Sequence, residues 1–373
     1  MHSFTIGMEE EFFLVDKATR ALVPRVPNAF FLECRKAYPE QIVGEFLRCQ
    51  VELISKPCSS ISDLYQEQKQ LRKTLVEIAD HYGLAPIASS THPFSSWLKQ
   101  QPNKKPRYQY LFQELQASGR RMAVCGMHLH NGIENIEERL LIFNRLYFYL
   151  PYFLALSTSS PFWEGHDTGL NSFRLSVIDG LPRSGMPPRF ENIKDYQEGI
   201  SHLIKSSVIK DASEIWWDAR LNKNYPTIEL RIMDICTRLQ DTTAIGALYA
   251  CLIEWIRRNK HEAHLIAGFR ELITNENRWR VQRYPVKELS FLDFKDTKLI
   301  SAHEFYKNWI SELTPIALEL KCEHELNGVF EILKNGTSAD KQRNLFNQST
   351  HDGCSRREAL VKVVDHLIKE TRL

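Results

Sequence analysis

The chain has 373 residues, of which 43% are hydrophobic, 25% charged and 11% aromatic. These fractions are typical of a folded globular protein and exclude the disordered, collagen-like and membrane classes. The 48 Lys and Arg nearly balance the 46 Asp and Glu, which gives a formal charge of +2. We therefore expect no extended field that attracts nucleic acid or an anionic membrane, and any phosphate site must be local.

The cysteines and the first residues bear on the cellular compartment. Eight cysteines are scattered without a C-x-x-C pair: Cys34, Cys49, Cys58, Cys125, Cys236, Cys251, Cys322 and Cys354. This spacing fits neither a zinc framework nor a secreted disulfide scaffold. A strand pattern begins by Thr5 and glutamates occupy positions 9 to 11, unlike the basic start and apolar core of a signal peptide. We therefore expect reduced thiols in a cytoplasmic protein.

The first third of the chain alternates strand-like runs with one strong helix. Strands are predicted at Phe4–Val15, Phe46–Ile54 and Met122–Ile133. A helix is predicted over about Ile61–Tyr82 and is stopped by Gly83. Its apolar residues recur on one stripe, which should pack on the sheet. This mixture indicates an α+β fold.

The later segments are expected to be loops followed by helices. Residues 159–190 are rich in Ser, Gly and Pro, which predicts long surface loops of the kind that often serve substrates. A strand at Thr227–Asp234 leads into a helix at about Asp241–Arg258, and the part after His261 is mostly helical. No repeat or linker marks a boundary. We expect one catalytic domain over residues 1–373, with a mostly helical C-terminal part from about 261 to 373.

The most apolar stretch is Leu140–Ser157. It contains Asn144, Arg145 and Pro151, which a lipid-spanning helix accommodates poorly. We interpret it as a buried helix, although it could equally serve the interface of a homodimer.

Four predicted strands carry the chemistry, because each places two polar or ionisable side chains two residues apart, on one face. The pairs are Glu9 with Glu11, Gln50 with Glu52, His128 with His130, and Glu229 with Arg231. One such strand by itself is more often a sheet with a wet face. Four of them, dominated by acids and histidines, favour a lined cavity.

The residue types in that cavity suggest a metal and a phosphate. Carboxylates suit Mg2+, and an imidazole also tolerates Mn2+. Zinc is disfavoured because the chain lacks HExxH and a cysteine cluster. An arginine beside a metal-binding glutamate is suited to a transferring phosphoryl group. Neither a P-loop nor a G-x-G-x-x-G fingerprint is present, so the sheet itself must hold the nucleotide.

Taken together, five motifs give a specific resemblance. They are Thr5–Phe12, Thr91–Phe94, Gly126–His130, Ser159–Gly165 and Pro226–Arg231. On these motifs nearly the whole chain resembles glutamate-cysteine ligase family 2, the bacterial carboxylate-amine ligases. The resemblance implies a glutamine-synthetase-like fold, in which a curved, mainly antiparallel sheet has helices on its outer face and binds ATP and Mg2+ on its concave face. The sequence departs from the family pattern at Arg283-Tyr284-Pro285 and at Asn131.

The resemblance also implies roles for individual residues. The implied metal ligands are Glu9, Glu11, Glu45, Glu52, His128 and Glu229, and the implied phosphate-binding arginine is Arg231. Glu45 lies seven residues before Glu52, so a turn must separate them if both face the site. Gln50, His130 and Arg220 are expected either to contact metal, substrate or ATP, or to be hydrogen-bonded structural residues.

The activity implied is that of a glutamate–cysteine ligase, which supplies glutathione biosynthesis. L-Glutamate would be activated by ATP as an acyl phosphate and captured by L-cysteine or another amine. Three alternatives stay open at this point: a ligase for a different acid and amine, a phosphotransferase of the same fold, and a non-catalytic metal- or nucleotide-binding protein. Small-molecule substrates are the expected partners in every catalytic case.

Overall fold

A computed structural model describes residues 4–259, 268–294 and 298–372. Its centre is a seven-stranded sheet in the order β10-β11-β5-β1-β3-β2, with β4 also paired to β1. Every pairing in this sheet is antiparallel. The strands are β1 (Ile6–Asp16), β2 (Ile42–Gly44), β3 (Gln50–Ile54), β4 (Leu84–Ile87), β5 (Met127–Gly132), β10 (Ala219–Leu221) and β11 (Thr227–Leu230).

Strand β1 is the axis of the sheet. It pairs with β3 along one edge and, along the other, with β5 through its first half and β4 through its second half. Phe12, Phe13, Leu14 and Val15 are fully buried, as expected for a strand with neighbours on both edges. In the first half, alternation sends Met8 and Glu10 to one face and Glu9 and Glu11 to the other.

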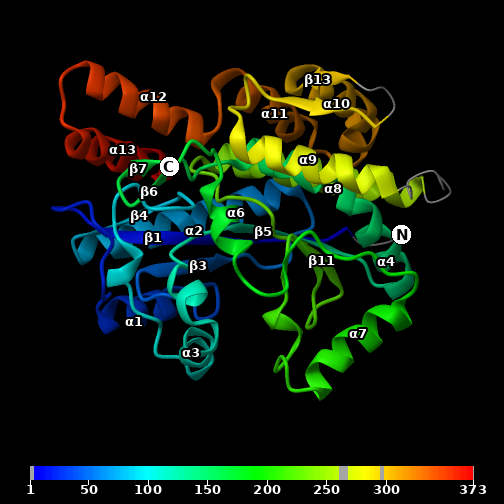
Figure 1. Ribbon diagram of the computed structural model, residues 1–373, viewed down its shortest axis with the longest axis horizontal. Helices are drawn as coiled ribbons and strands as arrows, with labels where there is room; N and C mark the ends of the chain where they lie inside the picture. The colour runs from blue at the N-terminus through cyan, green and yellow to red at the C-terminus, as the bar shows by residue number, and fades with distance from the viewer. Residues whose placement is uncertain (1–3, 260–267, 295–297, 373) are drawn as a thin grey trace.

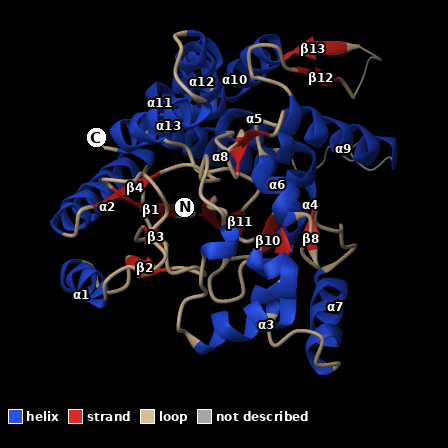
Figure 2. Ribbon diagram, turned by 60° about the vertical axis from the view of Figure 1, so that its left-hand side comes forward, coloured by secondary structure: helices blue, strands red, loops and turns tan. Residues whose placement is uncertain are grey.

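Two long helices cover the face that carries Glu10. They are α2 (Ile61–His81) and α8 (Leu239–Arg258), which contact each other and the strands beneath them. The oxygen of Ser60 caps α2 by accepting from the backbone of Asp63 at 3.0 Å. Figure 2 shows these helices on one side of the sheet, away from α3 and α7. They therefore form the outer layer.

Further helices extend this layer and flank the sheet (Figure 1). Helices α9, α10 and α11 pack near α8, whereas α12 and α13 lie near β4. Their bounds are α1 (Asn28–Ala37), α3 (Pro106–Arg120), α4 (Ile136–Leu146), α5 (Leu150–Ser157), α6 (Phe173–Ile178), α7 (Ile193–Lys205), α9 (Gly268–Arg283), α10 (Ala302–Glu319), α11 (Glu323–Asn335), α12 (Ser338–His351) and α13 (Arg356–Thr371). Short strand pairs are β6 (Phe162–Trp163) with β7 (His166–Asp167), β8 (Ser184–Gly185) with β9 (Trp216–Trp217), and β12 (Ser290–Leu292) with β13 (Leu299–Ser301).

The apolar stretch predicted as a buried helix is a core element. Among the described residues, Ile136–Ser157 is long and apolar enough to cross a membrane by length and composition. However, 78% of its most apolar 18-residue stretch is buried within the protein. A short 3-10 turn at Tyr147–Tyr149 joins α4 to α5, and α5 packs against α8 and α9. Its hydrophobicity therefore serves internal packing.

Two elements differ from the sequence prediction. The run Phe46–Ile54 is not one strand, because β3 begins only at Gln50. Residues 45–49 form the turn that joins β2 to β3. The segment 159–190, predicted as loops, contains α6, the β6–β7 pair and strand β8. Its Ser, Gly and Pro residues shape the turns, but apolar Leu175 and Val177 are buried and anchor a helical turn. The α+β fold with helices on the outer face of a mainly antiparallel sheet is confirmed.

Candidate active site on the inner sheet face

Strand register gathers the predicted site residues on the inner face of the sheet, opposite α2 and α8. Glu9 lies beside His128 on β5, and Glu11 lies beside Glu52 on β3. Glu229 on β11 has His130 on one side and Arg220 on the other. Directly paired residues in a sheet point to the same face. Residues that are 9 to 119 positions apart in the chain thus become neighbours.

One group on this face could hold a metal ion. Glu9, His128 and Glu229 each offer a ligand atom, and these three atoms all lie within 4.8 Å of one another. His128 Nδ1 is 3.0 Å from a Glu9 oxygen and 4.0 Å from a Glu229 oxygen. Burial, with the nearby Arg231 charge, lowers the pKa of His128 to about 4. The imidazole is therefore neutral at pH 7, which is the form that binds a metal.

A second group consists of three carboxylates, Glu11, Glu45 and Glu52. Glu45 follows β2, and its backbone N–H donates to the carbonyl of Gln50 at 3.2 Å across the hairpin. This is the turn that the sequence required between Glu45 and Glu52. The Tyr108 hydroxyl donates to Glu45 at 2.7 Å, and the Gly126 backbone donates to Glu11 at 2.5 Å. The structure therefore brings Glu45 to the same face as the other two acids.

The electrostatics of these three carboxylates fit a divalent cation. Burial, with the Glu45 charge, raises the pKa of Glu11 to about 7. Burial also raises the pKa of Glu52 well above its usual value, and the charges of Glu9, Glu45 and Glu11 add to this effect. Like charges held together in this way need protons or a cation. Oxygen ligands of this kind suit Mg2+.

In the first group, which contains Glu9, His128 and Glu229, arginines balance the negative charge of Glu229. Arg220 donates to Glu229 at 2.9 Å, and Arg231 also donates to Glu229. Asn222 adds a third donor at 3.0 Å. Burial alone would raise the pKa of Glu229, but the charges of Arg231, Arg220 and His130 hold it far below its usual range. Glu229 is therefore ionised, and the two guanidinium groups beside it are of the kind that also pairs with phosphate oxygens.

His130 and Gln50 are placed differently from each other. His130 Nε2 is 3.3 Å from a Glu9 oxygen, outside hydrogen-bond geometry, and is left without a hydrogen bond among the described residues. Gln50 is saturated by the protein: its amide donates to the Val124 carbonyl at 2.6 Å, and its oxygen accepts from the Leu47 backbone at 2.9 Å. His130 thus pairs with Glu9 at ion-pair distance, whereas Gln50 supports the β2–β3 turn.

Sequence reasoning missed Arg174. It lies on α6, is 5% exposed, and donates to the carbonyls of Ile232 and Arg231 at 3.1 and 3.2 Å. Its Nε has no partner in the described structure. A Cβ on Gly126 would lie 2.5 Å from the Arg174 guanidinium, so a larger residue there would displace the guanidinium from its present position. That glycine, directly before Met127-His128, was the available sign that a bulky group approaches β5.

Arg278 is another residue whose place sequence reasoning did not assign. From α9 it donates to Asp218 at 2.7 Å and to Asp179 at 2.7 and 2.8 Å. The Asp218 carbonyl in turn accepts from the backbone of Arg231 at 2.8 Å. Arg278 therefore positions the strand end that carries Arg231. Residues 283–285, where the sequence departs from the family pattern, do not interrupt the contacts of Arg278 with Asp218 and Asp179.

Two cavities open beside the inner face. One, of about 90 Å3, is lined by both carboxylates and arginines, including Glu11, Glu45, Arg174 and Arg231, with Trp216 and Trp217 at its wall. The other, of about 330 Å3, lies beside Glu9 and His130 and is lined mainly by apolar and backbone groups. Two separate approaches to one charged face are what a reaction with two or more substrates requires.

This combination of fold and site defines the class of carboxylate-amine ligases. The model of glutamate-cysteine ligase family 2 matches residues 5–365. A relative from Rhodospirillum rubrum with the provisional name glutamate–cysteine ligase 2 is 39% identical over 99% of this chain and 96% of its own length. The chain therefore belongs to glutamate-cysteine ligase family 2.

Solved structures share the fold at low sequence identity. The glutamate–cysteine ligase of Francisella tularensis, solved in complex with AMP, has a TM-score of 0.72 and 13% identity, over 99% of this chain and 89% of its own. The bifunctional glutathione synthetase of Pasteurella multocida has a TM-score of 0.70 and 16% identity, over 99% of this chain and 52% of its own. These likenesses establish the fold predicted from the sequence.

Proposed function

We propose that this chain is an ATP-dependent ligase that joins the γ-carboxylate of L-glutamate to the amine of L-cysteine or of another small molecule. The observation that carries the proposal is the pair of carboxylate-rich groups on one sheet face, with Arg231 bonded to Glu229 of one group and lining the same cavity as Glu11 and Glu45 of the other. Mg2+ or Mn2+ would be held by Glu9, His128 and Glu229 and by Glu11, Glu45 and Glu52. When bound, these ions neutralise charge on the phosphates of ATP.

The larger cavity is suited to the nucleotide. Ile6, Ile54, Pro57 and Tyr225 supply apolar surface at its wall, and Tyr225 is 66% exposed. A flat base can pack on such a surface while the phosphates extend toward Glu9. The AMP in the Francisella structure supports nucleotide binding by this fold. His130 lines the same cavity beside Glu9 and would hold that carboxylate in place next to the phosphates.

The narrower cavity is suited to the amino acid that is activated. Arg174 and Arg231 can pair with carboxylate oxygens, and Trp216 and Trp217 close the wall. The Arg174 guanidinium is held by the two backbone carbonyls, so its orientation is fixed before the substrate arrives. This assigns recognition of the acid to α6 and the end of β11.

The two chemical steps follow from this placement. A γ-carboxylate oxygen of glutamate attacks the γ-phosphorus of ATP, and the bond to the bridging oxygen breaks to release ADP. The amine nitrogen then attacks the acyl carbon, phosphate leaves, and the amine loses a proton. Arg231 and Arg220 stabilise charge on the transferring group, while the buried face limits water. No covalent enzyme nucleophile is needed.

The proposal is tested by measuring ADP release with ATP and Mg2+, and by identifying products by mass. We compare glutamate alone, glutamate with cysteine, and panels of other acids and amines. An amide that depends on ATP, an acid and an amine is the expected result, and its mass identifies the pair. Phosphorylated product without an amide would indicate a phosphotransferase, and nucleotide binding without turnover would remove the proposal.

A further inference from the structure

A cavity of about 590 Å3 lies between α1, β2 and the loop that precedes α3. Its lining residues are Arg25, Val26, Asn28, Phe31, Leu32, Arg35, Gly44, Arg48, Asn103, Lys104 and Lys105. None of them lines either cavity beside the candidate active site. The volume is within the range typical of small-molecule pockets, roughly 300–1,000 Å3.

The lining carries five cationic side chains and no acidic one. Within the described parts of the chain, Arg25, Arg35 and Lys104 form no ion pair or side-chain hydrogen bond. Arg48 donates only to the Pro102 carbonyl at 3.0 Å, and Lys105 donates to the Gly44 carbonyl at 2.9 Å. In a protein of formal charge +2, this is a local excess of positive charge. Such an arrangement repels itself unless an anion is present.

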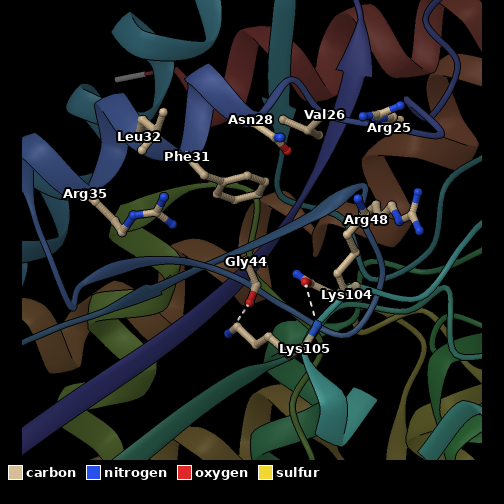
Figure 3. A pocket seen from close by; sticks show the side chains of 11 residues that line it. Arg25, Val26, Asn28, Phe31, Leu32, Arg35, Gly44, Arg48, Lys104 and Lys105 are labelled. Carbon is tan, nitrogen blue, oxygen red and sulfur yellow. Dashed lines mark hydrogen bonds between the residues drawn. The ribbon is translucent and has the colours of Figure 1, made fainter. Parts of the chain in front are cut away.

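Phe31 gives the pocket an apolar surface. In Figure 3 its ring occupies the middle of the view, with Arg35 on one side and Arg48 on the other. Val26 and Leu32 add apolar contact, and Leu32 is 53% exposed. A simple inorganic anion would leave this surface unused. The lining therefore fits a molecule that has both charged groups and an apolar or flat body.

The pocket borders the candidate metal ligands at the end of β2. The Gly44 carbonyl accepts from Lys105 at 2.9 Å, and the Asn103 amide donates to the Glu45 backbone carbonyl at 3.1 Å. A Cβ at Gly44 would lie 2.8 Å from the Asn103 amide and 3.3 Å from Phe31, so the pocket wall is closely packed at this glycine. Arg25, Arg35 and Lys104 form no hydrogen bond or ion pair with Glu45 in the described structure, so these three cations are the ones left for a ligand.

We propose that this pocket is a binding site for a small organic polyanion. Its phosphate or carboxylate groups pair with Arg25, Arg35 and Lys104, and its apolar body packs on Phe31. Guanidinium groups hold both kinds of anion through paired hydrogen bonds. Several negative charges are required, because one charge would neutralise only a fraction of the five cations.

The test is isothermal titration calorimetry of the full chain in low-salt buffer without metal or nucleotide. The probes are naphthyl phosphate, benzenetricarboxylate and inorganic phosphate. We expect either aromatic probe to bind more tightly than inorganic phosphate, and the tighter of the two identifies the anionic group. Arg35→Ala should weaken that binding roughly tenfold, the effect of one lost charged hydrogen bond. Lys36→Ala removes the same charge from the same helix outside the pocket and should leave affinity within about twofold.

Two further variants locate the probe. Phe31→Leu keeps an apolar side chain but removes the ring, so it should weaken the aromatic probes and not inorganic phosphate. Arg231→Ala changes the inner sheet face and should leave probe affinity unchanged. Equal weakening by Arg35→Ala and Lys36→Ala, loss of binding only in Arg231→Ala, or no binding of any probe at millimolar concentration would overturn the proposal.

Discussion

Both faces of strand β1 carry glutamate, but the surroundings of these glutamates differ. Glu10 faces α2 and is fully buried against Arg72, which donates to it at 2.9 and 2.5 Å. Glu9 and Glu11, one residue to either side, face the candidate active site, where Glu11 meets other carboxylates. Glu10 on the outer face is neutralised by the protein itself, as is Glu229 on the inner face. The inner-face group Glu11, Glu45 and Glu52 keeps unbalanced negative charge. The difference teaches that charge left uncompensated, and not charge alone, marks the functional face.

The largest expected effect is the loss of stability when the buried ion pair on the outer face of β1 is broken. Arg72→Ala leaves the Glu10 charge buried and unpaired, and also frees the Thr237 carbonyl that Arg72 holds at 2.8 Å. We predict a loss of about 3–5 kcal/mol in the free energy of unfolding, measured by urea denaturation. Lys73→Ala, at the next position on α2 with a side chain 62% exposed, is the matched control and should change stability by less than about 0.5 kcal/mol. Equal effects of the two substitutions would show that the pair is not structural.

On the inner face, the largest effect should be on rate. Arg231→Ala or Glu229→Gln is predicted to lower kcat roughly 100-fold or more, because Arg231 is preorganised for charge in the transition state and Glu229 both holds Arg231 and is a proposed metal ligand. Steady-state ADP release measures this effect, with circular dichroism to verify folding. Lys334→Ala, which removes an exposed positive charge on α11, should leave kcat near that of the unchanged protein. Near-normal turnover of Arg231→Ala would contradict the role given to this face.

The three-carboxylate group should respond to metal. Glu52→Gln is predicted to raise the Mg2+ concentration for half-maximal activity by about 10–100-fold, the range known for weaker perturbations of metal sites. Gln50→Glu is a useful contrast, because Gln50 supports the turn and does not face the metal with a free atom. It should lower stability without improving metal affinity. An unchanged Mg2+ requirement in Glu52→Gln would remove Glu52 from the proposed ligands.

In the metal-free protein, the same substitution should stabilise the fold, and more so as pH rises. Burial and neighbouring charges raise the pKa of Glu52 well above 4.5, so the folded state binds a proton that the unfolded chain releases. Stability of the unchanged protein therefore falls as pH rises above that value, and glutamine removes this penalty. The gain should approach about 1.4 kcal/mol for each unit of raised pKa. Melting curves of both proteins from about pH 5 to pH 8 measure the difference, and a gain that shrinks with pH would contradict the assignment.

Strand alternation alone predicts which side chains of the candidate site share a face of the sheet. Glu9 with Glu11, and His128 with His130, share a face as the two-residue spacing requires. The hairpin was not predicted, because β2 has three residues and the run Phe46–Ile54 is apolar enough to resemble one strand. Arg174 was missed because it lies in a segment whose Ser, Gly and Pro content predicts loops. Its role depends on packing against Gly126, a contact between residues distant in sequence that no local pattern encodes.

The central claim is that the inner face promotes transfer of a phosphoryl group to a carboxylate before an amine is added. It is tested most directly with glutamate that carries heavy oxygen in its γ-carboxylate, or with the acid that the product screen identifies. During amide formation, mass spectrometry of the released inorganic phosphate should detect one heavy oxygen transferred from the acid. Amide formation with unlabelled phosphate would contradict an acyl-phosphate path and the account of this site.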